Sequence, residues 1–102
     1  MNNELLNKLI FLKEKYLSDG FIVIGYFGSY SRNENTDNSD IDILYCFSED
    51  FHKKYIGWDV YTRLEEIELD FENQLGCKVD FANRDALNEV SRKYILPEVN
   101  YV

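Results

Sequence analysis

Two apolar runs separated by a short polar segment constrain the fold more than any other feature of the sequence. The runs are residues 21–27 (FIVIGYF) and 40–47 (DIDILYCF), and both are rich in the β-branched and aromatic residues that favour strands. We expect the first strand to be buried on both faces. Asp42 lies between two isoleucines of the second run, so that a strand with an otherwise apolar centre carries a carboxylate into the fold. Such a group needs a partner.

Helical periodicity predicts two long helices. Apolar residues recur at helical spacing over residues 3–17, and again after Asp59, which can cap a helix that ends at Gly76. A third strand is expected at residues 77–82 (CKVDFA).

A last helix is expected to open at Asp85 and to close at Pro97, with Val90 and Tyr94 facing inward. The expected order is helix, strand, short helical turn, strand, helix, strand, helix. It indicates an α/β (α+β) fold in which a small mixed sheet of about three to four strands packs with helices. The length favours one domain over residues 1–102.

Charge and composition exclude several classes of protein. The chain has 11 basic and 19 acidic residues, a formal net charge of −8, which argues against direct nucleic-acid binding and leaves room for metal cations or a basic protein partner. No apolar run approaches the roughly 20 residues that span a bilayer, and the N-terminus does not resemble a targeting segment. Cys46 and Cys77 lack metal-site spacing and are expected to be reduced, buried thiols of a cytoplasmic protein.

Three aspartates form the candidate catalytic and metal-binding set. Side chains alternate along a strand, so Asp40 and Asp42 point to the same face, where they repel each other unless a cation lies between them. Oxygen ligands on a rigid strand suit Mg²⁺, which completes its coordination with water and substrate phosphate. Asp80, in the third predicted strand, supplies a further carboxylate if that strand neighbours the second. Three acids on one face are enough for a site with two metal ions.

Gly28 and Ser29 follow the first strand and are the candidate phosphate-binding residues. A glycine lets the backbone approach a ligand closely, and the amides after it can point at phosphate oxygens. Arg32, one turn later, could add positive charge. The alternative is an ordinary turn, and Asp80 has an alternative too, as an exposed sheet residue.

The spacing of these residues resembles the DNA-polymerase-beta-like nucleotidyltransferase superfamily, whose signature is Gly-Ser followed by Asp-x-Asp. The segments GSYSR, SDIDILYCF and KVDFAN, together with the C-terminal ALNEVSRKYILPEVNYV, are similar to its smallest branch, the minimal nucleotidyltransferases. The resemblance implies a palm-like fold, with Gly28 and Ser29 on the triphosphate of ATP, Asp40 and Asp42 on the metals, and Asp80 as the third carboxylate. Where the family often has Ala-Arg-Gly, this chain has Ser31-Arg32-Asn33.

The same resemblance implies a biological role. Many members of this branch are antitoxins paired with HEPN-domain ribonuclease toxins, and some transfer AMP from ATP to a toxin tyrosine. The sequence therefore predicts a Mg²⁺-dependent protein adenylyltransferase that acts as an antitoxin, alone as a homo-oligomer or assembled with its toxin.

Two alternatives remain open at this stage: an antitoxin that only binds its toxin, and transfer to a small molecule. Trp58 and the tyrosines near it are expected in the core or at a protein interface rather than against a base.

Overall fold

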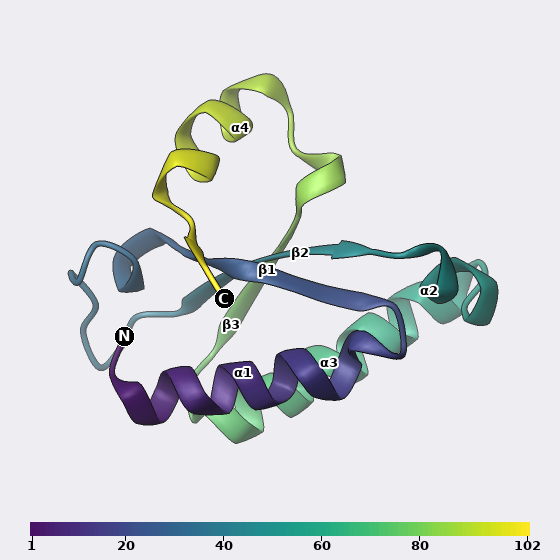
Figure 1. Ribbon diagram of the computed structural model, residues 1–102, viewed down its shortest axis with the longest axis horizontal. Coiled ribbons are helices and arrows are strands. Elements are labelled where there is room, and N and C mark those ends of the chain that lie inside the picture. Colours follow the sequence, from purple (N-terminus) through teal and green to yellow (C-terminus); the bar gives the residue numbers. More distant parts are fainter.

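The computed structural model describes residues 1–102 as a four-stranded mixed sheet with two long helices on one face (Figure 1). The strands are β1 (Phe21–Phe27), β2 (Ile41–Phe47), β3 (Val79–Asn83) and β4 (Asn100–Tyr101), in the order β3-β2-β1-β4. The helices are α1 (Asn3–Leu17), α2 (Glu49–Lys54), α3 (Trp58–Leu75) and α4 (Glu89–Ile95), with short 3-10 turns η1 (Gly28–Tyr30), η2 (Arg84–Ala86) and η3 (Leu96–Glu98). The predicted fold class is confirmed.

The sheet combines two kinds of pairing. β1 runs antiparallel to both β2 and β4, whereas β2 and β3 are parallel. The parallel pair requires a crossover, and α2 with α3 supplies it. Because β3 is an edge strand, one of its sides is left without a neighbouring strand.

The core lies between the sheet and the pair α1 and α3. Alternate residues of the strands, among them Phe21, Ile43 and Val79, are buried there with Leu9 of α1 and Phe71 of α3. Phe21 packs edge-on against Phe71, with ring centroids 6.0 Å apart. The prediction that β1 is buried on both faces is wrong, since its residues alternate between buried and half-buried over most of its length. The reason is that the long helices cover only one face of the sheet.

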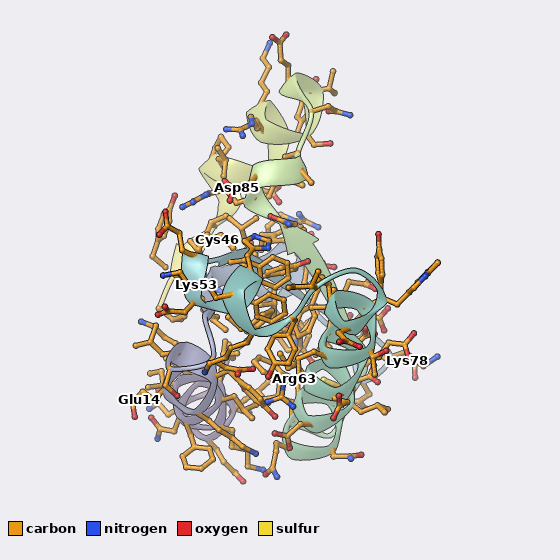
Figure 2. All side chains as sticks on the ribbon, turned by 90° about the vertical axis from the view of Figure 1, so that its right-hand side faces the viewer. Glu14, Cys46, Lys53, Arg63, Lys78 and Asp85 are labelled. Atoms are coloured by element: carbon orange, nitrogen blue, oxygen red, sulfur yellow. The ribbon has the colours of Figure 1, made fainter.

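The C-terminal segment stands on the other side of the sheet (Figure 1). Figure 2 shows Asp85 in this segment, well away from the helical layer in which Arg63 lies between α1 and α3. The last helix does not begin at Asp85 as predicted: residues 84–86 form η2, and Asn88 caps α4 by accepting a hydrogen bond from the Ser91 amide at 2.8 Å.

Two residues of α4 were placed wrongly by the sequence. Val90 and Tyr94 were expected to face inward, but they are 66% and 68% exposed. No residue of α4 is buried, because the helix projects from the sheet instead of lying along it. The helical spacing of apolar residues therefore predicted that this segment forms a helix, but it did not predict correctly which side of the helix is buried.

Other boundaries shifted by one or two residues. The second strand begins at Ile41, so that Asp40 lies just outside it, and the third begins at Val79 instead of Cys77. Helix α3 begins at Trp58 after Gly57, without a cap from Asp59, and ends at Gly76 as predicted. Helix α2 was not predicted. No helix has the length and apolar character needed to cross a membrane.

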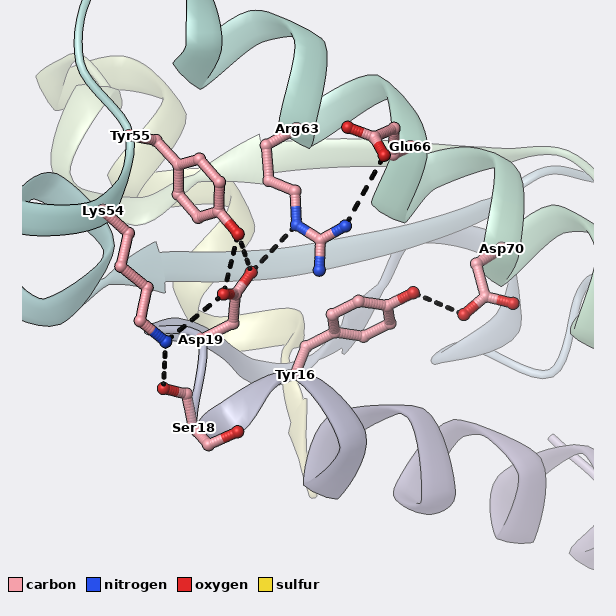
Figure 3. Close-up of polar contacts among 8 residues, drawn as sticks. All are labelled: Tyr16, Ser18, Asp19, Lys54, Tyr55, Arg63, Glu66 and Asp70. Carbon is pink, nitrogen blue, oxygen red and sulfur yellow. Dashed lines mark hydrogen bonds and ion pairs between the residues drawn. The ribbon is translucent and has the colours of Figure 1, made fainter.

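A polar network joins the end of α1 to α2 and α3 (Figure 3). The Asp19 carboxylate accepts hydrogen bonds from the Tyr55 hydroxyl at 2.8 Å and from Arg63 Nε at 2.9 Å, and Lys54 lies 3.5 Å away. Beside it, the Tyr16 hydroxyl donates to Asp70. Although burial opposes ionisation, the Arg63 and Tyr55 hydrogen bonds hold the pKa of Asp19 below its ordinary value. The network fixes the crossover helices to α1.

Replacing this carboxylate should weaken the fold. We expect Asp19→Asn to lower the free energy of unfolding by about 1–3 kcal/mol, because three donors lose a charged acceptor. Urea denaturation at neutral pH measures the change, and Glu14→Gln on the exposed side of α1 is the matched control. Since the pKa of Asp19 is lowered by folding, its contribution is present above the unfolded pKa and lost as pH falls through the folded one. Equal stability of the two variants would contradict the role given to Asp19.

Candidate active site

The sheet brings the three predicted aspartates together. Asp42 on β2 and Asp80 on β3 are direct partners in the parallel register, and Asp40 lies two residues before Asp42. Ile41, Ile43 and Val79 on the same strands are buried in the core, so the two aspartates lie on the sheet face away from α1 and α3. The sequence predicted that Asp80 joins the other two acids if the third strand neighbours the second. The pairing of β2 with β3 confirms that the two strands are neighbours.

The proximity of the acids affects the ionisation of Asp42. Burial, followed by the charges of Asp80 and then Asp40, raises the pKa of Asp42 from an ordinary 3.8 to about 6. None of the three carboxylates forms an ion pair with a lysine or arginine, although the chain has several such pairs elsewhere. The charge of Arg32 lowers the pKa of Asp42, but it is the smallest of these influences, and no cation of this chain forms an ion pair with Asp42.

Gly28 packs closely against the side chain of Asp42. The first strand ends at Phe27, whose backbone pairs with Asp42, and Gly28 then turns with a φ of +72°. A side chain at Gly28 would place its Cβ 2.1 Å from Asp42 Oδ2. Only glycine combines this backbone conformation with so close a carboxylate. The turn that begins with Gly28 therefore lies directly against the acidic cluster.

Ser29 and Arg32 follow in the same turn. Ser29 is half-buried beside Gly28, and the Arg32 amide donates to the Gly28 carbonyl oxygen at 3.2 Å. The Arg32 guanidinium points elsewhere: its NH1 contacts both carboxylate oxygens of Glu98 at 3.0 Å, and its Nε donates to Glu34. Of the predicted phosphate-binding residues, Gly28 thus lies at the cluster and Ser29 follows it in the turn, whereas the Arg32 side chain is held by Glu98 of the C-terminal segment and by Glu34.

Two glutamates near the site were missed by the sequence analysis. Glu72 of α3 accepts a hydrogen bond from the Val79 amide at 3.1 Å, directly before Asp80. Burial, and then the neighbouring charges of Glu72 and Asp80, raise the pKa of Glu68. Their helical spacing was visible in the sequence, but only the tertiary fold brings the end of α3 beside the edge strand.

The donor set fits a hard divalent cation that shares its ligands with a substrate. All three side chains offer carboxylate oxygens, and their mutual repulsion would be relieved by positive charge. No group of three or more acidic, histidine or cysteine side chains is gathered tightly enough to enclose a metal by itself. The set therefore suits Mg²⁺ with part of its coordination completed by phosphate oxygens and water.

The hollows of the surface lie elsewhere. One of about 300 Å³ is lined by residues of α1 with Gln74, and one of about 290 Å³ by Glu65, Glu68, Leu69 and Glu72 of α3. Neither contains any of the three aspartates. The sheet face that carries the acids is an open surface rather than an enclosed small-molecule pocket.

Comparison with known proteins places these observations in a family. The nucleotidyltransferase domain model matches residues 8–99. The chain is 35% identical to the protein adenylyltransferase MntA of Thermococcus cleftensis, over 97% of this chain and 94% of that protein. It is 39% identical to a Methanocaldococcus jannaschii protein assigned as a protein adenylyltransferase, over 89% of this chain and 83% of that one.

Solved structures show the same architecture. A minimal nucleotidyltransferase structure superimposes with a TM-score of 0.73 at 25% identity, covering 100% of this chain and 97% of that one. A toxin–antitoxin crystal structure with AMP-PNP has a TM-score of 0.63 at 26% identity, covering 87% of this chain and 63% of that one. The resemblance to the minimal nucleotidyltransferases that was inferred from the motifs is thus confirmed by the family model, the related sequences and the solved structures.

Neutralising Asp42 should stabilise the apo protein at neutral pH. Because folding raises its pKa to about 6, the native state is favoured by a protonated Asp42 below pH 3.8 and loses that advantage as pH rises through 6. In the presence of a chelator at pH 7.5, we expect Asp42→Asn to increase the free energy of unfolding by about 1–2 kcal/mol. The increase should disappear at pH 4. Asp37→Asn in the exposed loop is the control, and an unfolded Asp42→Asn variant would mean that Asp42 has a structural partner.

Two glycines with nearly the same φ separate strain from the close approach of Asp42. Gly28 and Gly76 have φ of +72° and +74°, but a Cβ at Gly76 would meet nothing within 4 Å. We expect Gly76→Ala to cost about 1–2 kcal/mol from strain alone, and Gly28→Ala to cost more. In an Asp42→Ala background the extra cost should vanish, as urea denaturation of the four variants will measure. Additive costs would contradict the contact between Gly28 and Asp42.

Proposed function

Because the chain belongs to the nucleotidyltransferase domain family, we propose that it transfers AMP from ATP to a hydroxyl group of a partner toxin, with one catalytic domain spanning residues 1–102. The observation that carries this proposal is the cluster of Asp40, Asp42 and Asp80 beside the Gly28 turn, none of which forms an ion pair with a lysine or arginine. A protein that only bound its partner would have no physical need for repelling acids at this position.

Each residue of the cluster has a role in the proposed reaction. Gly28 and Ser29 hold the triphosphate through the backbone turn and the serine hydroxyl, and Asp40 with Asp42 would hold Mg²⁺. Bound Mg²⁺ would neutralise phosphate charge and make the acceptor hydroxyl more acidic. Arg32 would reach the phosphates after exchanging Glu98 and Glu34 for them, since phosphate is a matched partner for its guanidinium.

The transfer balances as a single displacement at phosphorus. The acceptor oxygen forms a bond to the α-phosphorus of ATP, the bond from that phosphorus to the bridging oxygen breaks, and pyrophosphate leaves with the electron pair. Asp80, which lies beside Asp42, would accept the hydroxyl proton.

A protein acceptor suits this chain better than a small molecule. The aspartates lie on an open sheet face, and neither surface hollow includes them, so that an acceptor has to be presented from outside. The similar toxin–antitoxin structure with AMP-PNP supports a toxin as the partner and an adenine nucleotide as the substrate. From the family resemblance, the partner is a HEPN-domain ribonuclease toxin and the modified hydroxyl is that of a tyrosine.

Intact mass of the toxin tests the proposal. The protein is incubated with ATP, Mg²⁺ and the purified product of the adjacent reading frame, and the toxin should gain one or more AMP units. Replacing Mg²⁺ by a chelator should abolish the gain. Asp40→Asn combined with Asp42→Asn should lower the rate at least a hundredfold, because the charge stabilisation at phosphorus is lost.

The matched control is Asp37→Asn, which removes an exposed acid from the same loop and should leave the rate unchanged. Modified toxin should remain inactive after this protein is removed. If the double variant protects cells as well as the wild type does, the chain acts by binding alone and the proposal is wrong.

A further inference from the structure

Helix α3 presents an exposed side that the fold does not use. At 100° per residue, one side of the helix faces away from α1 and carries the exposed residues Trp58, Tyr61, Glu65 and Leu69, while the half-buried Glu68 and Glu72 form its border toward β3. We call these six residues the outer α3 face. In Figure 2, α3 forms one flank of the molecule, with α1 and the core on its inner side. The buried residues of α3, Ile67, Phe71 and Leu75, lie on the opposite side of the helix.

Large apolar side chains on this face are strongly exposed. Trp58 is 83% exposed, Tyr61 63% and Leu69 60%, and the rings of Trp58 and Tyr61 contact each other with centroids 5.8 Å apart. Ile56, directly before the helix, is 74% exposed. A tryptophan and a tyrosine held together in water are typical of the anchors of a protein interface.

The charges on this face indicate what covers it. Its three glutamates form no ion pair, and the face has no lysine or arginine: Arg63 points inward to Asp19. Leu69 and the three glutamates surround the hollow of about 290 Å³. A second copy of this chain would set six carboxylates against one another, which argues against self-association through this face. A partner with basic and apolar side chains would pair with the glutamates of the outer α3 face and bury its exposed aromatic rings.

The face also leads to the catalytic acids. It runs about 21 Å from Trp58 to Glu72, and Glu72 accepts the hydrogen bond of Val79, the residue before Asp80. Because β3 is the edge strand, no further strand separates α3 from Asp80. A protein lying along α3 can therefore reach around this edge to the cluster.

We propose that the outer α3 face is the docking surface for the protein acceptor, and that it binds a basic and apolar surface of that protein. This inference rests on the proposed function and adds the place where the partner binds. The anchors are Trp58, Tyr61 and Leu69, and the three glutamates set orientation and speed of association.

Binding and transfer are measured separately to test it. The probe is the purified product of the adjacent reading frame, and binding is measured with the Asp40→Asn/Asp42→Asn variant so that no modification occurs. Trp58→Ala and Leu69→Ala should each raise Kd at least tenfold. Phe11→Ala, which removes a side chain 61% exposed on α1, should change Kd less than twofold.

Charge is tested by replacing Glu65, Glu68 and Glu72 together by glutamine. The triple variant should associate more slowly, and its Kd should depend less on salt concentration. In the otherwise wild-type enzyme, Trp58→Ala should raise KM for the partner at least tenfold with kcat unchanged. Thermal melts verify that each variant is folded. We expect the Trp58 and Leu69 variants to fold, because both side chains are mostly exposed and contribute little to the core.

The outcomes separate this inference from the proposed function. Transfer with unchanged KM and Kd in both apolar variants would overturn the docking surface and leave the proposed function standing. A homodimer that Trp58→Ala dissociates would also overturn it, since the face would then be occupied by a second copy. A wild-type chain that neither binds nor modifies the probe would overturn both.

Discussion

The backbone N–H of Ile41 donates to the carbonyl oxygen of Lys78 at 2.9 Å, at the start of the parallel pairing between β2 and β3. In this register Asp42 lies opposite Asp80, while Ile41 and Val79 enter the core. A shift by one residue would bury the carboxylates and expose the isoleucines, so the burial of the apolar residues fixes the position of the acids. The site thus depends on the same pairing that forms the core.

The repulsion within the acidic cluster lowers the stability of the fold, and contacts elsewhere in the protein offset this loss. Burial, and then the charges of Asp80 and Asp40, make Asp42 hard to ionise, and the opposing charge of Arg32 is the smallest of these influences. Stability comes instead from the aromatic core around Phe21 and Phe71 and from the Asp19 network, both on the helical side of the sheet. This division leaves the opposite side of the sheet free for the nucleotide and cation of the proposed function, and the open surface there agrees with an acceptor supplied by another protein.

Arg32 shows how the C-terminal segment is coupled to the site. Its guanidinium is held by Glu98 of η3, although its backbone belongs to the turn that begins at Gly28. The sequence could identify Arg32 by its spacing from Gly28, but Glu98 is 66 residues away and became its partner only through folding. Helix α4 illustrates the same limit, because the apolar spacing of Val90 and Tyr94 did not reveal that the helix projects into solvent.

The sequence by itself determined the two long helices, the three longer strands and the candidate residues Gly28, Asp42 and Asp80, because these follow from local periodicity and from motif spacing. Only the tertiary structure decided that Asp80 lies beside Asp42, that Glu72 caps the edge strand, and that Trp58 remains in water. The physical reason is that strand order, register and the packing of one helix against a sheet depend on contacts between residues far apart in the chain. Local patterns carry no information about those distances.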